Sequence, residues 1–340
     1  MKKSFILFVI MLILASCTDQ LDQPDMGEVM EGYAIQAPTN ESDSQIEPLR
    51  HNDTRLEAGI TRLLGEVLYD FMDWSKAIVY VVETKTGRLK ADVSLKWRGG
   101  KWVPFTDTYD QEQSTMMCGP TYLALLSSGK VTPGSMFDTK SGVYGDVRDH
   151  NWRRGGFGEI SLERALCVWS QVTFAMGKDY VYRGNEVVYE TLVRAYLADN
   201  PNKAMGILTF YNAIANNGCM VKIVSEGEDG IVLQEQIAEP EHIKALQVGL
   251  EHAVSEGLYR KASNDKVKVS ACGRVFITKG NHRRMELCGY FPSEDPQYTI
   301  MVVLEKEGLP ASAGSMCGPI LSNTIDLLVN LYGVQKSAED

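Results

Sequence analysis

The sequence has few histidines, no excess of basic residues and no long apolar run, and each shortage excludes a class of protein. The five histidines of the 340-residue chain are scattered, and no two cysteines have metal-ligand spacing, so we expect no metal site and no cofactor. The formal net charge of −10 argues against nucleic acid as a partner. The longest apolar run, Phe5–Ala15, is well short of the about 20 residues that a membrane-spanning helix needs.

The first residues instead have the order of a secretory signal. Two lysines precede the apolar run, and Leu14–Cys17 (L-A-S-C) ends it in a pattern that looks like a bacterial lipobox, which predicts a lipoprotein signal over 1–17 with the lipid on Cys17. Residues 18–53 are rich in Asp, Glu, Gln, Ser, Pro and Asn, which predicts a flexible tether. We therefore expect a bacterial cell-envelope protein, lipid-anchored to a membrane and facing the periplasm or the cell surface.

Six further cysteines follow Cys17, and the sequence leaves their redox state open. An exported protein can form disulfide bonds. Cys272 and Cys288 are equidistant from Gly280, so they would face each other if the chain forms a hairpin there, whereas buried free thiols are the alternative. The six are Cys118, Cys167, Cys219, Cys272, Cys288 and Cys317.

Hydrophobic periodicity predicts strands at both ends of the folded part and helices between them. A helical repeat covers 55–72, and the β-rich runs 77–83 and 89–95 enclose a turn that makes them a hairpin. We expect one α+β domain over 54–335, in which 74–100 and 265–305 build one antiparallel sheet and 105–260 is mostly helical. Further helices are predicted over 161–175, 186–197, 206–216, 243–256 and 318–331, and further strands over 267–277, 285–291 and 298–304.

Five blocks in this order resemble the transpeptidase domain of class B penicillin-binding proteins, of the division or elongation type of Bacteroides-like bacteria. The resemblance covers about residues 54–335 and implies a penicillin-binding transpeptidase fold, which is serine β-lactamase-like. In that fold an antiparallel sheet is flanked by helices, a helical subdomain is attached, and three motifs meet in an active cleft. The blocks are A-I-V-Y-V-V-E-T-K-T-G-R-L-K-A at 77–91, G-K-V-T-P-G-S-M-F-D-T at 129–139, R-D-H-N-W-R-R-G-G-F-G-E-I-S-L-E-R-A-L at 148–166, T-F-Y-N-A-I-A-N-N-G at 209–218 and L-C-G-Y-F-P-S-E-D-P-Q-Y at 287–298.

The first motif of that family, S-x-x-K, has a nucleophilic serine one helical turn before the lysine that takes its proton. Here Ser114 keeps the serine, but Met117 replaces the lysine, and a thioether does not accept a proton near neutral pH. Ser114 is therefore either a vestigial nucleophile or simply a helix N-cap. Cys118 would be another nucleophile, although no histidine is near it in sequence.

The second and third motifs, S-x-N and K-T-G, have also lost polar groups. In the second, Trp169 replaces the relay serine and Gln171 carries an amide one methylene longer than asparagine. In the third, Ala271 and Cys272 replace lysine and threonine, and only Gly273 remains. Losing a nucleophile–base unit can cost a serine enzyme about 10⁶ in rate, so we expect negligible turnover.

Arg274 follows the third motif and has two interpretations. Its planar guanidinium would suit a C-terminal carboxylate in the cleft. As an edge-strand residue it would instead lie in water.

Together the residues and the resemblance favour a penicillin-binding-protein-like domain that is catalytically inactive. It would be a binding or regulatory partner in peptidoglycan synthesis, in contact with a stem peptide or with cell-wall synthesis proteins. One alternative is an active D,D-transpeptidase or carboxypeptidase that uses Ser114 with a non-standard base, Asp110 or Glu112. A β-lactam sensor is another alternative, and it too would need acylation of the serine.

Overall fold

The computed structural model describes residues 51–68, 74–105, 114, 116–200 and 203–333. Its centre is a six-stranded antiparallel sheet with the strand order β10-β11-β12-β1-β2-β3. Strands from the two ends of the chain therefore complete one sheet, as the sequence predicts. The predicted signal, Cys17 and the tether up to residue 50 lie outside the described residues.

Two sequence-local groups of strands meet in the middle of this sheet. The first three strands are consecutive in the chain, and the hairpin predicted between the first two is confirmed. The last three strands form a second meander, whose final strand pairs with the first strand of the sheet. The strands are β1 (Trp74–Glu83), β2 (Leu89–Arg98), β3 (Lys101–Pro104), β10 (Ser270–Ile277), β11 (His282–Phe291) and β12 (Tyr298–Glu307).

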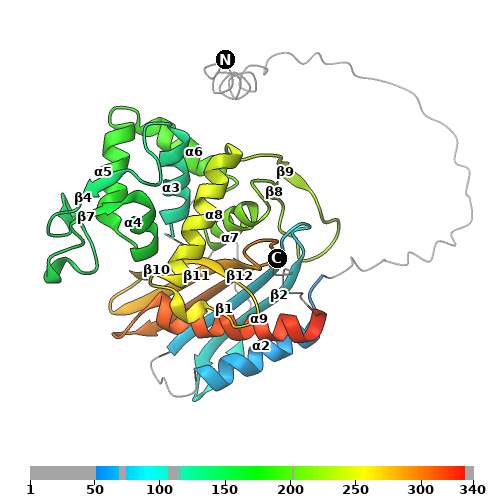
Figure 1. The fold of residues 1–340 in the computed structure, drawn as a ribbon. Coiled ribbons are helices and arrows are strands. Elements are labelled where there is room, and N and C mark those ends of the chain that lie inside the picture. Colours follow the sequence, from blue (N-terminus) through cyan, green and yellow to red (C-terminus); the bar gives the residue numbers. More distant parts are fainter. Residues whose placement is uncertain (1–50, 69–73, 106–113, 115, 201–202, 334–340) are drawn as a thin grey trace, which may run out of the picture. The chain divides into compact units, whose positions relative to one another are not determined.

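Helices cover both faces of the sheet (Figure 1). α2 (Thr54–Val67) and α9 (Gly318–Tyr332) pack on each other and cover one face. α7 (Ala204–Ala215) and α8 (Pro240–Ser255) contact β10, β11 and β12 from the other face. The two central strands, β1 and β12, are apolar along most of their length, because neither face of the sheet meets water there.

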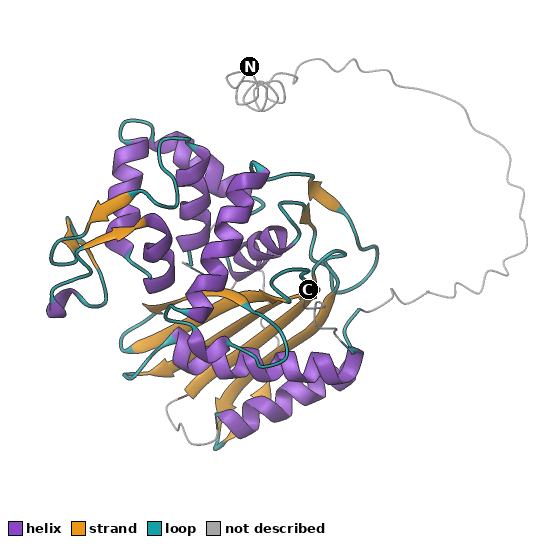
Figure 2. Ribbon diagram, viewed as in Figure 1, coloured by secondary structure: helices purple, strands orange, loops and turns teal. Residues whose placement is uncertain are grey.

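A helical subdomain packs against one side of α8, which α3 and α4 contact (Figure 2). Its helices are α3 (Cys118–Ser127), α4 (Leu162–Val168), α5 (Gln171–Tyr182) and α6 (Glu186–Tyr196). Nine of the ten residues of α3 are buried, so this helix is the core of the subdomain. The short strands are β4 (Met136–Asp138), β5 (Val143–Tyr144), β6 (Val147–Arg148), β7 (Glu159–Ser161), β8 (Met220–Val221) and β9 (Val232–Gln234).

The prediction of a single helix over 161–175 is wrong in its extent. Ser161 is the N-cap as expected, since its hydroxyl accepts the Arg164 N–H at 3.0 Å, but α4 ends at Val168. Trp169 takes a left-handed conformation with φ of 52°, and Ser170 then caps α5. The break lies at the second motif, so it sets the backbone conformation of Trp169 and Ser170 there.

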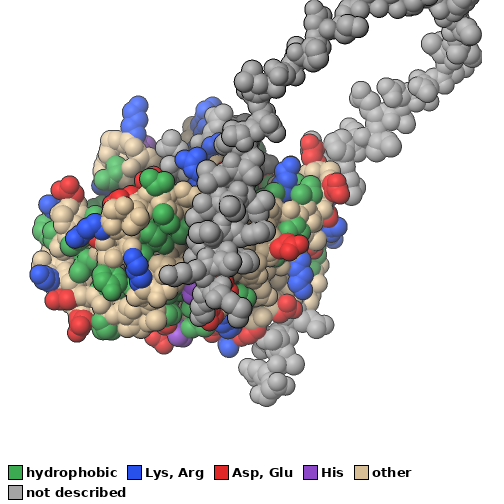
Figure 3. Space-filling view, turned by 90° about the horizontal axis from the view of Figure 1, so that it is seen from above, with side chains coloured by type: hydrophobic (Ala, Val, Ile, Leu, Met, Phe, Trp, Pro, Cys, Tyr) green, Lys and Arg blue, Asp and Glu red, His purple; other side chains and the backbone are tan. Residues whose placement is uncertain are grey.

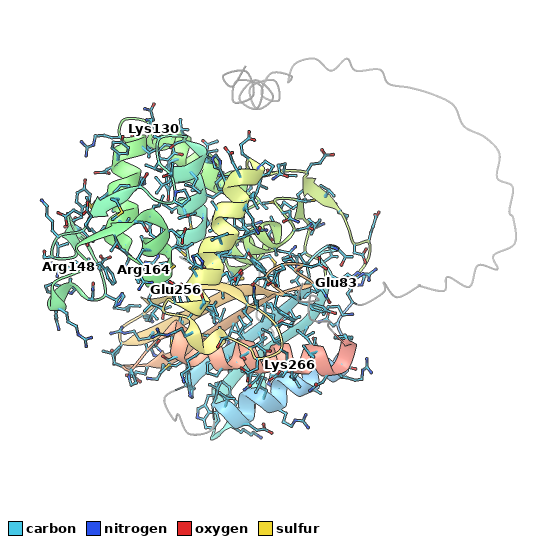
Figure 4. All side chains as sticks on the ribbon, viewed as in Figure 1. Glu83, Lys130, Arg148, Arg164, Glu256 and Lys266 are labelled. Carbon is cyan, nitrogen blue, oxygen red and sulfur yellow. The ribbon has the colours of Figure 1, made fainter. Side chains whose placement is uncertain are left out.

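Charged side chains on the surface form local pairs. On the part of the face that Figure 3 leaves uncovered, acidic and basic side chains are interspersed. Lys266, labelled in Figure 4, lies beside α9, and its ammonium is 2.8 Å from the Asp326 carboxylate. Within the described ranges, no helix combines the length and the apolar character needed to cross a bilayer.

Candidate functional site

The three motif positions come from three separate elements and are joined by side-chain contacts. Ser114 and Met117 precede α3 and Cys118 begins it, Trp169 and Gln171 lie at the junction of α4 with α5, and Ala271 to Arg274 lie in β10. Cys118, directly after the first motif, contacts Cys272 of the third motif, and Trp169 of the second motif contacts Arg274, directly after the third. The fold thus brings the segments of the three motifs together.

Ser114 is fully buried and is hydrogen-bonded on both sides of its hydroxyl. Its Oγ donates to Glu286 Oε2 at 2.5 Å and accepts the Met116 N–H at 3.2 Å. The expectation that Ser114 caps a helix is wrong, because α3 begins at Cys118 with Met117 as its N-cap residue. Met117 is therefore not one helical turn beyond Ser114, and its half-buried side chain packs against the core.

Glu286 is the residue at this site that the sequence reasoning missed. It lies in β11, fully buried, and its Oε1 accepts from Arg284 Nε at 2.8 Å. Arg284 Nη1 in turn donates to Glu305 Oε1 at 2.9 Å. The signal was a glutamate inside the apolar strand predicted over 285–291, since a charge is buried in such a strand only with partners. The bases that the sequence suggested, Asp110 and Glu112, lie outside the described residues.

Two opposing effects set the protonation of Glu286. Burial raises the pKa of its carboxyl above the ordinary value, while the Arg284 guanidinium and the Ser114 hydroxyl act in the opposite direction without cancelling the effect of burial. A carboxylate of raised pKa is a stronger base than one in water. Glu286 is consequently the one group described near Ser114 that has the chemistry of a proton acceptor for it.

A contact between two sulfur atoms links the first residue of α3 to the third motif. Cys118, the first residue of α3, has its Sγ 2.6 Å from Sγ of Cys272 in β10 and 3.5 Å from Oη of Tyr211. All three side chains are buried. Burial raises the pKa of both Cys272 and Tyr211 well above their ordinary values, so both stay protonated at neutral pH and neither is a base.

Trp169 of the second motif contacts Arg274, the residue directly after the third motif. The guanidinium carbon of Arg274 is 5.4 Å from the centroid of the Trp169 ring, within cation–π range. Arg274 does lie on an edge strand, yet it is half-buried, and burial lowers the pKa of its guanidinium. The indole that replaces the relay serine therefore serves to pack the arginine.

The other motif positions have structural surroundings. A Cβ on Gly273 would lie 2.4 Å from the Glu286 carbonyl oxygen, so only glycine fits where β10 meets β11 there. The Gly273 carbonyl accepts from Tyr259 Oη at 2.6 Å, and Ala271 is buried opposite Gly289. Gln171 is the first residue of α5, and its amide donates to the Arg148 carbonyl over a long 3.5 Å.

The chain does form a hairpin at Gly280, the condition under which Cys272 and Cys288 are expected to face each other. Cys272 in β10 and Cys288 in β11 are direct partners in the antiparallel register. The six cysteines in the described part of the chain are free thiols in the structure. Among these residues, no three His, Cys, Asp or Glu side chains come together as ligands for a metal ion.

No protein-family model matches this chain, and no curated protein matches its sequence. Solved structures do match its fold. A transpeptidase domain of penicillin-binding protein 3 from Burkholderia pseudomallei aligns with a TM-score of 0.67 and 14% identity, over 86% of this chain and 99% of that domain. A peptidoglycan glycosyltransferase from Burkholderia ambifaria aligns with a TM-score of 0.68 and 16% identity, over 86% of this chain and 100% of that chain.

A third match comes from another genus. The transpeptidase domain of the D,D-transpeptidase FtsI4 from Legionella pneumophila aligns with a TM-score of 0.58 and 14% identity, over 82% of this chain and 98% of that domain. The chain therefore has the fold of penicillin-binding-protein transpeptidase domains, and the predicted α+β fold class is confirmed.

Proposed function

We propose that this chain is a penicillin-binding-protein-like domain without transpeptidase activity, which acts as a binding or regulatory partner in peptidoglycan synthesis. The fold supports the connection to the cell wall. The observation that carries the loss of activity is what the replaced motif residues contact: the sulfur of Cys272 lies against Cys118, and the Trp169 indole packs on the Arg274 guanidinium. In the family that the sequence resembles, the threonine of the third motif and the serine of the second stand at the positions of Cys272 and Trp169.

The burial of Ser114 supports the same proposal. Acylation requires that the serine oxygen reach a substrate carbonyl, at about 3 to 3.5 Å in a reactive geometry. Ser114 is fully buried and its oxygen is held by Glu286 and by the Met116 N–H. General acid–base assistance supplies about 10² to 10⁴ in rate, and the lysines, the relay hydroxyl and the threonine are all replaced.

A fluorescent penicillin tests this proposal directly. The purified protein is incubated with the reagent beside an active class B penicillin-binding protein as positive control, and denaturing gels are scanned for label. We expect no stable label on this chain and the same result for Ser114→Ala. A label that appears on the wild type and disappears in Ser114→Ala would overturn the proposal.

One observation favours a second candidate, a working serine acyltransferase or hydrolase. Glu286 lies 2.5 Å from the oxygen of Ser114, just below the range of about 2.6 to 3.2 Å expected of a general base. In this reading Glu286, rather than a lysine, takes the serine proton. Labelling of the wild type that is lost in both Ser114→Ala and Glu286→Gln, but kept in the exposed-site variant Glu307→Gln, would select it.

The partner and the location belong to the same proposal. The lipobox-like sequence ending at Cys17 supports attachment to a membrane of the cell envelope through a lipid, with the domain on the periplasmic or outer side. The side chains of Trp169 and Cys272 pack against neighbouring side chains of this chain. We therefore favour cell-wall synthesis proteins over a stem peptide as the partner. Crosslinking in intact cells, followed by purification of this chain from membranes, should then recover those proteins, and recovery of none of them would contradict this assignment.

A further inference from the structure

Two buried cysteines from distant parts of the chain meet at the boundary between the helical subdomain and the sheet. Cys118 begins α3 and Cys272 lies in β10, 154 positions further along the chain. The two sulfur atoms are 2.6 Å apart. A disulfide bond has a sulfur–sulfur distance of about 2.05 Å, so the two elements need to move very little for the sulfurs to be joined.

The surroundings of this pair do not suit it to other chemistry. Among the described residues no group of metal ligands includes it. Cys118 also contacts the Tyr211 hydroxyl at 3.5 Å, which is neutral because burial raises its pKa well above the ordinary value. A reactive cysteine needs a cationic or basic neighbour that stabilises the thiolate, and neither Tyr211 nor Cys272 is one; the Arg274 guanidinium acts on Cys118 through its charge, with no hydrogen bond to the sulfur among the described contacts.

We propose that Cys118 and Cys272 form a disulfide bond in the exported protein, which joins the first residue of α3 to the edge strand β10. The bond would join the segment directly after the first motif to the third motif. The inference rests on the proposed export only for the supply of an oxidant, and it is otherwise independent of the partner and of catalytic activity.

The oxidant is a small-molecule or protein disulfide, such as oxidised glutathione or the disulfide of a thiol oxidoreductase. One cysteine thiolate attacks this disulfide, forms a mixed disulfide and releases the first thiol. The second cysteine attacks the mixed disulfide at the sulfur of the first cysteine, forms the Cys118–Cys272 bond and releases the second thiol. Two electrons pass to the oxidant, whose own sulfur–sulfur bond breaks, and the two protons lost by the cysteines are taken up by the released thiols.

Burial determines when this exchange takes place. Cys118 is 3% exposed and Cys272 is fully buried, so a bulky oxidant does not reach them in the folded domain. Burial also raises the pKa of the Cys272 thiol, which keeps it protonated and slow to react. The bond therefore forms while the chain is folding, and afterwards it is protected from reductants.

Cys288 is the competitor for Cys272. It is the direct cross-strand partner of Cys272 and is also fully buried. The observation that favours Cys118 is the sulfur contact at 2.6 Å, and the longer loop that this bond closes makes it the more stabilising of the two once formed.

Peptide mapping identifies the bond. The full chain is purified from membranes of the exporting cell, its free thiols are blocked with N-ethylmaleimide under denaturing conditions at low pH, and it is digested without reductant for mass spectrometry. A second sample is refolded in vitro with oxidised glutathione, so that a failure of export is separated from a failure of the inference. We expect one reducible peptide pair joined through Cys118 and Cys272, with Cys167 and Cys317 recovered as blocked thiols. A bond between Cys272 and Cys288, or recovery of Cys118 and Cys272 as thiols in both samples, would overturn the proposal.

Thermal unfolding provides a second measurement. Wild-type protein refolded with a phosphine reductant should have a Tm lower than the oxidised protein by on the order of 5 °C or more. Cys118→Ser and Cys272→Ser should each remove this redox-dependent difference, whereas Cys167→Ser, a matched change at another buried thiol, should retain it. Equal Tm values for oxidised and reduced wild-type protein would contradict a bond that constrains the fold, and the peptide map decides the case even if the serine variants do not fold.

Discussion

At the scale of single residues, the unusual feature of this domain is a row of charged side chains buried in the sheet. Arg284 and Glu286 are 3% and 0% exposed, and their ion pair at 2.8 Å is extended to Glu305 on the neighbouring strand and to Ser114. Buried ions lose hydration, and only close partners offset that loss. Ser114 is one of those partners, because its hydroxyl donates a hydrogen bond to the buried Glu286 carboxylate. This bond explains why the serine is kept even if its hydroxyl attacks no substrate.

We therefore predict that Glu286→Gln destabilises the domain by about 2 to 3 kcal/mol, because it weakens the charge-assisted bond between this side chain and the buried Arg284 guanidinium. Urea unfolding followed by circular dichroism measures the change. The control is Glu307→Gln at an exposed position of β12, which should stay within about 0.5 kcal/mol of wild type. Equal midpoints for the two variants would show that the buried pair contributes little to stability.

At the scale of secondary-structure elements, the junction of α4 and α5 shapes the second motif. Ser170 is fully buried, its hydroxyl accepts the Thr173 N–H at 3.1 Å, and it donates to Asp149 Oδ2 at 3.0 Å. The sequence did not predict the break, because left-handed residues are usually Gly or Asn and Trp169 carries no such signal. The backbone at this residue is held by the cap that follows and by the packing of the indole on Arg274.

Comparing the two N-caps gives a prediction for this junction. Ser170→Ala should cost about 2 kcal/mol, since it removes a helix cap and leaves a buried Asp149 oxygen without a donor. Ser161→Ala should cost about 1 kcal/mol, because Ser161 is only half-buried and serves as a cap alone. Thermal unfolding of both variants tests the order, and a larger loss in Ser161→Ala would contradict it.

The contact between β2 and α2 predicts a pH dependence. Burial raises the pKa of Asp92 to about 6 from an ordinary value of 3.8, with a further rise from Glu57, although the Ser94 hydroxyl at 3.2 Å opposes it. The folded state binds this proton more tightly than the unfolded state. The contribution of Asp92 to stability is therefore fully present below about pH 3.8 and is lost as the pH rises through about 6.

Asp92→Asn should consequently gain stability relative to wild type as the pH rises from 4 to 7, by about 1 to 2 kcal/mol once partial exposure to solvent is allowed for. Urea unfolding of both proteins at several pH values in this interval measures the difference. The exposed change Asp146→Asn serves as the control and should show a smaller trend. A difference between Asp92→Asn and wild type that is constant with pH would contradict the raised pKa.

Periodicity was enough to predict most elements, but not the contacts between them. The hairpin of β1 and β2, the helices α6 to α9 and the register that pairs Cys272 with Cys288 follow from local patterns and turn residues. Two features of the site depend on residues far apart in the chain: Ser114 with Glu286, separated by 172 positions, and Cys118 with Cys272, separated by 154. Local patterns contain no information about such pairs until the order of strands in the sheet is known.

At the scale of the whole molecule, the sheet joins the two ends of the domain. β1 lies between β2 and β12, so strands from the first and last quarters of the chain are adjacent in the middle of the sheet. Pairing strands that are far apart in the chain costs loop-closure entropy, and only the contacts made when the last strands join the sheet offset it. A cross-link between α3 and β10 would lower that cost for the later steps of folding, which is where the proposed Cys118–Cys272 bond would act.

Attachment to the membrane is the whole-molecule property that remains to be tested, and it depends on Cys17. A lipid contributes about 0.8 kcal/mol for each buried CH₂ group, so a lipidated Cys17 would hold a domain without a spanning segment at the bilayer. We predict that cells supplied with labelled palmitate incorporate the label into the wild-type chain and that Cys17→Ser abolishes it. Mass spectrometry should also show that the wild-type N-terminus is a modified Cys17. Cys219→Ser, a matched cysteine change in the folded domain, should keep the label, and label retained in Cys17→Ser would contradict the assignment.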